Sequence, residues 1–188
     1  MAAILEIPEV RQRISPLSVE EYHRLGEFNE RGRRTELLRG LVIEKMSKSP
    51  LHSTTGSLLY DLLFPQVPPG YCIRKEEPLT LADSEPEPDI SVARGLKTDF
   101  ITAHPSTAEL VIEIAVSSAL LDRENASLYA EAGVKEYWIV LAATRKVEVY
   151  RRPEHGLYQE KSILGPEAVL TCTSVPELTV RISDLFPS

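Results

Sequence analysis

The pattern of apolar and polar positions along the chain predicts a series of strands. The segment ELVIEIAV (109–116) is almost uninterrupted in apolar residues, which is typical of a strand covered on both faces. The remaining strand-like runs are YCIRKEEPLTLA (71–82), DISVA (89–93), KEYWIVLAATRKVEVYRR (135–152, two strands with a turn near 143–145), LYQEKSIL (157–164), AVLTC (168–172) and LTVRISDLF (178–186).

Helical periodicity and capping residues predict three helices between these runs. SPLSVEEYHRLGEF (15–28) has Ser18 as a good N-cap, followed by acids in the first turn. LHSTTGSLLYDLLFPQV (51–67) ends at a proline-rich cluster, and SALLDRENASLYAEAG (118–133) is closed by a glycine. RTELLRGLVIEKMS (34–47) predicts a hairpin, strand–RG–strand.

These elements together predict an α/β (α+β) domain, a mixed sheet with helices on at least one face. The chain has 188 residues and a mass of 21.0 kDa, which suits a single core. We expect one domain over residues 16–188, preceded by an N-terminal arm over residues 1–15 that shows no clear period. No internal repeat or low-complexity segment interrupts the chain.

Charge and composition exclude some classes of protein. The net charge of −7 argues against a protein that coats DNA passively, but not against a nuclease, since metal ions cancel the charge of site carboxylates locally. The two cysteines, Cys72 and Cys172, form no zinc pattern. No run approaches the ~20 apolar residues that span a bilayer, and the N-terminus is too short and acidic for a signal peptide, so we expect a cytoplasmic protein.

Two carboxylates stand within apolar runs, where acids are depleted. Asp89 precedes Ile90, and Glu113 lies in the middle of 109–116. Paired strands would bring both acids into one pocket, and a divalent cation such as Mg²⁺ would relieve their repulsion. The chemistry that follows is metal-assisted phosphodiester hydrolysis. The alternative is that each acid caps a strand end or pairs with an arginine.

The segments PDISV (88–92), ELVIEIAVSS (109–118) and LDRENASLYAEAGVKEYWIV (121–140) resemble the putative restriction endonuclease family of bacterial proteins, in the PD-(D/E)XK nuclease superfamily. TELLRGLVIEKMSKSPLH (35–52) also matches the N-terminal signature of that family. The resemblance covers roughly residues 16–150 and implies a restriction-endonuclease-like central sheet flanked by helices.

The resemblance implies a role for each matching residue. Asp89 matches the metal-binding aspartate and Glu113 the second acidic ligand, with the carbonyl of Ile114 or Ala115 as a further ligand. Glu36 matches an acid on the early strand that completes the metal shell. His52 matches a histidine that follows it, although a solvent-exposed residue at a helix start would look the same.

The sequence departs from the superfamily pattern where a lysine is expected. Two residues after the second acid stands Ala115, and in the following helix the matching place is Asn125 or Ala126. Helical spacing puts Asn125 on the apolar face, towards the sheet that carries Glu113. An amide cannot stabilise developing negative charge as an ammonium does, so activity could be weak or absent. Arg123 would reach the site only if it were open on that side.

The resulting expectation is a DNA endonuclease that depends on Mg²⁺ or Mn²⁺ and works as a homodimer or higher homo-oligomer. Its active-site residues would be Asp89, Glu113, Glu36 and Asn125, and its metal ligands Asp89, Glu113, Ile114 and Glu36. Two alternatives stay open: a degenerate nuclease fold that binds nucleic acid or a protein partner without cutting, and an acidic interaction module without a nucleic-acid role.

Overall fold

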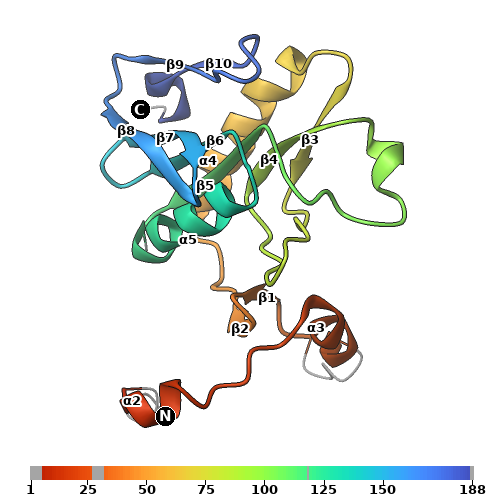
Figure 1. Cartoon of the computed structure of the whole chain (residues 1–188). Coiled ribbons are helices and arrows are strands. Elements are labelled where there is room, and N and C mark those ends of the chain that lie inside the picture. The colour runs from red at the N-terminus through yellow and green to blue at the C-terminus, as the bar shows by residue number, and fades with distance from the viewer. Residues whose placement is uncertain (1–5, 27–31, 118, 187–188) are drawn as a thin grey trace. The chain divides into compact units, whose positions relative to one another are not determined.

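The computed structural model describes residues 6–26, 32–117 and 119–186, which form two compact units (Figure 1). The hairpin unit comprises the described residues up to Lys45 together with Ala82–Pro86. The sheet unit comprises Met46–Leu81 and the described residues from Glu87 onwards. Each unit is described by itself.

The hairpin unit contains α2 (Pro8–Arg11), α3 (Val19–Gly26), β1 (Thr35–Leu38) and β2 (Leu41–Glu44). Antiparallel β1 and β2 confirm the predicted hairpin. Both turn residues have positive φ, 52° at Arg39 and 74° at Gly40, the backbone of a type I′ turn. A Cβ atom added at Gly40 would lie 2.3 Å from the Cβ atom of Pro16, so this close approach requires glycine.

A capping box opens α3, with Ser18 at the N-cap that the sequence predicts. The Ser18 Oγ atom accepts the N–H of Glu21, and the Glu21 carboxylate accepts the N–H of Ser18. The helix ends at Gly26, and the last predicted residues, 27 and 28, lie outside the described residues. In the predicted N-terminal arm the described part holds only the short helix α2.

A six-stranded mixed sheet in the order β3-β4-β5-β6-β7-β8 forms the centre of the sheet unit. Only β5 and β6 are parallel, and α5 connects them, since parallel neighbours need a crossover. The elements of this unit are α4 (Pro50–Leu63), η1 (Phe64–Gln66), β3 (Tyr71–Lys75), β4 (Ile90–Arg94), η2 (Lys97–Phe100), β5 (Leu110–Ala115), α5 (Ala119–Glu131), β6 (Glu136–Leu141), β7 (Lys146–Glu154), β8 (Leu157–Leu164), β9 (Val169–Thr171), β10 (Thr179–Arg181) and η3 (Ile182–Leu185).

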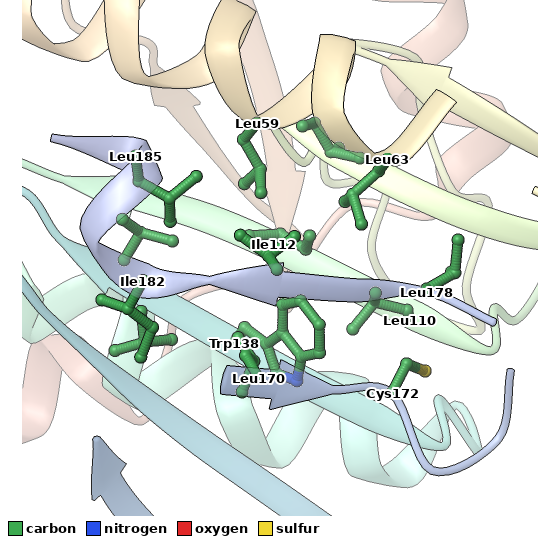
Figure 2. Close-up of a cluster of buried hydrophobic side chains, with 14 of the residues drawn as sticks. Leu59, Leu63, Leu110, Ile112, Trp138, Leu170, Cys172, Leu178, Ile182 and Leu185 are labelled. Atoms are coloured by element: carbon green, nitrogen blue, oxygen red, sulfur yellow. The ribbon is translucent and has the colours of Figure 1, made fainter. Parts of the chain in front are cut away.

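One face of the sheet packs against α4 and the antiparallel β9–β10 hairpin. Figure 2 shows Leu59 and Leu63 of α4 above Leu110 and Ile112 of β5, with Trp138 of β6 below them. All five side chains are fully buried. Because side chains alternate along a strand, the residues between these core positions point to the opposite face, where α5 lies (Figure 1).

Helix α4 approaches β5 closely at Gly56. A Cβ atom added to Gly56 would lie 3.1 Å from the Cδ1 atom of Ile114, which is tighter than ordinary van der Waals contact. His52 lies four residues earlier on the same helix, so it shares this face of α4. The absence of a side chain at Gly56 therefore sets how near α4 lies to the strand that carries Glu113.

The predicted fold class is confirmed: the chain is an α+β protein with a mixed central sheet flanked by helices. Two predicted strands end earlier than the sequence suggests. The strand predicted over 71–82 ends at Lys75, because Glu76 takes a left-handed backbone with φ 54°. The strand predicted over 178–186 gives way to the 3-10 helix η3 after Arg181.

The described residues divide into two compact units. The single domain expected over residues 16–188 stays a prediction. Within the described ranges, no helix combines the length and apolar character needed to cross a membrane.

Candidate active site

The register of β4 and β5 brings Asp89 and Glu113 together. β4 pairs with β5 through Ile90 opposite Ile112, so Asp89, one residue before β4, comes opposite Glu113. Opposite residues of an antiparallel pair project from the same face. The two acids singled out by the sequence are therefore neighbours at this end of the β4–β5 pair.

Each carboxylate binds a peptide N–H beside the other acid. Asp89 Oδ2 accepts the N–H of Ile114 at 2.9 Å, and Glu113 Oε2 accepts the N–H of Asp89 at 3.2 Å. Asp89 is buried, with 9% of its surface exposed. Backbone donors of this kind stabilise ionised carboxylates, which explains how acids are accommodated inside a sheet.

Two basic side chains complete the surroundings of Asp89. Lys48 Nζ lies 2.8 Å from Asp89 Oδ1, and His52 Nε2 lies 3.0 Å from Asp89 Oδ2. Burial alone would raise the pKa of Asp89, but the hydrogen bonds and charges of His52 and Lys48 outweigh it and lower the pKa. The Asp89 carboxylate is therefore ionised at neutral pH.

Glu76 adds a third carboxylate to the same row of the sheet. Its N–H donates to the carbonyl oxygen of Asp89 at 3.1 Å, which continues the β3–β4 pairing. Glu76 Oε1 lies 3.0 Å from Lys48 Nζ, so Lys48 bridges Glu76 and Asp89. Burial alone would lower the pKa of Lys48, but these two acids raise it, and the ammonium stays charged.

Helix α5 contributes Tyr129 and Asn125 to the same region. The fully buried Tyr129 donates its O–H to Glu113 Oε1 at 2.9 Å. Asn125 lies one helical turn earlier and is 8% exposed, as its inward position in the sequence predicted.

Arg123 points to a different acid. Its guanidinium binds Glu148 of β7, with Nη2 2.6 Å from Oε1 and Nε 3.0 Å from the same oxygen. Tyr150 and Lys161 also bind Glu148. The Arg123 guanidinium is therefore engaged with Glu148 of β7 and not with Asp89.

The remaining predicted site residues are placed as follows. Glu36 lies on β1 of the hairpin unit, where its carboxylate is 3.7 Å from Lys45 Nζ, so its part in a metal shell stays a prediction. Ile114 contributes its N–H to Asp89, and its carbonyl stays a predicted ligand. The carbonyl of Ala115 accepts the N–H of Ala142 at 2.9 Å.

Comparison with known proteins identifies the family. Residues 19–183 match the family model Uma2, described as "Putative restriction endonuclease". The chain belongs to the Uma2 family. No curated protein matches this Uma2 chain significantly.

The fold of this Uma2 chain is shared with a solved structure. The crystal structure of a putative nuclease belonging to DUF820 from Anabaena variabilis ATCC 29413 has a TM-score of 0.73 and 23% identity to the chain. The match covers 91% of this chain and 98% of the other. The family supports a nuclease-like function, while the structural likeness at this identity establishes the fold.

The donor chemistry of the Uma2 site suits Mg²⁺ or Mn²⁺. Asp89 and Glu113 supply carboxylate oxygens from opposed positions of β4 and β5. A carboxylate offers about four acceptor positions, and on Asp89 three of them are used by Lys48, His52 and the N–H of Ile114. Within the described part of the chain, no group of three or more His, Cys, Asp and Glu residues is assembled around a metal position. Mg²⁺ commonly takes one or two protein carboxylates, with waters and substrate phosphates completing its shell.

Three residues of this site were not found from the sequence: Lys48, Glu76 and Tyr129. Lys48 precedes Asp89 by 41 positions and lies just before α4, so no local spacing links the two. Glu76 was assigned to the interior of a longer strand. Tyr129 lies four residues after Asn125 on the same helix face, and this spacing was the signal that could have found it.

Proposed function

We propose that this Uma2 chain is a metal-dependent DNA endonuclease that hydrolyses phosphodiester bonds. The observation that carries the proposal is the opposition of Asp89 and Glu113, each fixed by a peptide N–H next to the other. Membership of a family described as restriction endonucleases supports the same class of substrate.

Asp89 and Glu113 would hold Mg²⁺ or Mn²⁺, with Glu36 and the carbonyl of Ile114 as further candidate ligands. When bound, such an ion polarises the phosphate and lowers the pKa of an attacking water.

The side chains of the protein prepare this site before any ligand arrives. Tyr129 and the peptide N–H groups fix the carboxylate oxygens, so little reorganisation is needed. His52 holds one oxygen of Asp89 from the start of α4. Burial of Asp89 limits competing water and strengthens every charge interaction around it.

The test is nicking of supercoiled plasmid DNA with Mg²⁺, with Mn²⁺ and with EDTA. Cleavage should require the metal and should be abolished in Asp89→Asn and in Glu113→Gln, which keep side-chain size. Asp61→Asn is the matched control, because Asp61 is an exposed acid on α4, and it should cleave like the wild type. Equal cleavage by all four proteins would refute the proposal.

A second candidate is a degenerate nuclease fold that binds nucleic acid or a protein partner without cutting. Ala115 and Asn125 favour it, because neither supplies a charge at the two places where the superfamily carries its lysine. This protein would shift duplex DNA in a gel without product, even with Mn²⁺. Asn125→Lys separates the two cases, since an added ammonium should raise cleavage in a chain that retains the metal site.

We also propose that the chain assembles as a homodimer or higher homo-oligomer, so that two sites act on the two strands of a duplex. Sedimentation velocity across a range of protein concentrations tests this. A monomer at all concentrations, with and without DNA, would refute it.

A further inference from the structure

We infer that Lys48 is the residue that contacts the phosphate to be cleaved, and that Glu76 positions it. The inference rests on the proposed function and assigns the cation that the site needs. Three carboxylates, Glu76, Asp89 and Glu113, lie in one row of the sheet, and they would repel a phosphodiester unless positive charge stood among them.

Lys48 is the lysine that meets this need. Its Nζ atom lies 2.8 Å from Asp89 Oδ1 and 3.0 Å from Glu76 Oε1, and its side chain is only 23% exposed. Most exposed lysines sample many rotamers, but two ion pairs on a mostly buried side chain hold this ammonium in place. Ser49 and Pro50 fix the chain directly after it, because Ser49 caps α4 and Pro50 is its first residue.

Three other polar side chains near the site, Arg123, Asn125 and His52, are less suited to contact the phosphate. Arg123 binds Glu148 through two nitrogen atoms. Asn125 occupies its place on α5 with an uncharged amide. His52 reaches Asp89 through Nε2, and its buried Nδ1 atom has no partner among the described residues.

Glu76 explains how Lys48 stays in the site during the reaction. A cation on Asp89 would weaken the attraction between Asp89 and the ammonium. Glu76 would still hold the Lys48 ammonium at the edge of the site. From there the ammonium can turn to a phosphate oxygen next to Asp89. The left-handed backbone of Glu76 is unfavourable for a non-glycine residue, and this cost is consistent with a functional position.

Substitution of Lys48 tests the inference by two independent readouts. Lys48→Met should lower the single-turnover rate of DNA cleavage at saturating Mg²⁺ by about 10²–10³-fold, the usual effect of removing one charge-stabilising contact. The affinity for Mn²⁺, measured by calorimetry, should not fall. Lys48→Arg should recover part of the rate. Lys146→Met removes an exposed lysine from β7 and should leave the rate unchanged.

The second readout is the salt dependence of duplex DNA binding in Ca²⁺. Loss of one phosphate contact should reduce the slope of log K against log [KCl] by about 0.9 in Lys48→Met. Cleavage by Lys48→Met within threefold of the wild type, or an unchanged slope, would overturn the role of Lys48. A wild-type chain that binds DNA without cutting would refute the endonuclease proposal separately, and the slope would still decide whether Lys48 contacts phosphate.

Discussion

Asp89 and Glu113 fix each other's position through the backbone: Asp89 Oδ2 accepts the N–H of Ile114, and Glu113 Oε2 accepts the N–H of Asp89. The acids are consequently part of the β4–β5 pairing as well as part of a candidate site. Substitutions should therefore separate a structural effect, through the lost acceptor, from a chemical effect, through the lost charge.

Asp89→Ala should destabilise the fold more than Asp89→Asn. Alanine leaves the N–H of Ile114 without an acceptor, which costs about 1–3 kcal/mol, whereas the asparagine oxygen can still accept it. Urea unfolding followed through Trp138, the single tryptophan and fully buried, measures both variants. Equal free energies of unfolding would contradict the structural part of this argument, and both variants should be inactive.

Lys48 and Glu76 should behave as one unit in cleavage assays. Glu76→Gln should slow cleavage about tenfold through misplacement of the ammonium, and should do so in kcat more than in KM. In the Lys48→Met background, Glu76→Gln should have little further effect, since nothing remains to be positioned. A double-mutant cycle measures this coupling, and strictly additive effects would mean that the two residues act independently.

Tyr129→Phe should slow cleavage several-fold without disturbing the core. The substitution keeps the buried ring and removes only the O–H that binds Glu113 Oε1. Tyr158→Phe is the matched control, because the Tyr158 O–H donates to the carbonyl of Val134. Similar small losses in thermal stability are expected for both, with a loss of rate in Tyr129→Phe alone. Equal cleavage rates in Tyr129→Phe and Tyr158→Phe would mean that the Tyr129 O–H has no influence on Glu113.

Glu148 should make the fold sensitive to acid. Burial alone would raise the pKa of Glu148, but hydrogen bonds from Arg123, Tyr150 and Lys161 lower it from 4.5 to about 2. Because the folded pKa is below the unfolded value, the group stabilises the fold above about pH 5, by up to about 3 kcal/mol, and this contribution is lost as the pH falls towards 2.

Unfolding free energies measured between pH 7 and pH 2 test this expectation. Glu148→Gln should be less stable than the wild type at pH 7, and the difference should shrink towards pH 2. Glu160→Gln, which removes an exposed acid paired with Arg152, serves as the control and should track the wild type. A difference that stays constant over this range would show that Glu148 acts through packing instead of charge.

The sequence predicts the elements of this fold well because their signals are local. The RG turn between two apolar runs, the Ser18 cap and the apolar run around Glu113 each lie within a few residues of the structure they determine. The pairing of Asp89 with Glu113 was also accessible, because two strands with one acid each suggest it. The α5 side of the site followed from helical spacing, which turns Asn125 inward.

Lys48 and Glu76 could not be found in this way. Their meeting depends on the β3–β4 register and on the path of the chain into α4, and neither follows from a periodic pattern. The strand expected over 71–82 hid Glu76, because the apolar residues beyond it continue the alternation while its own backbone breaks the strand. The resemblance implies a lysine at position 115, 125 or 126, whereas the lysine beside Asp89 stands at position 48.

Gly56 links the packing of α4 on the sheet to the geometry of the candidate site. A methyl group there would press on Ile114, whose peptide N–H holds Asp89, and would push back the helix that also carries His52. A substitution in the apolar interior could thus displace the candidate catalytic groups without replacing any of them. Substitutions in the apolar layer between α4 and β5 are therefore a second route, besides the polar residues themselves, by which evolution can change the activity of this chain.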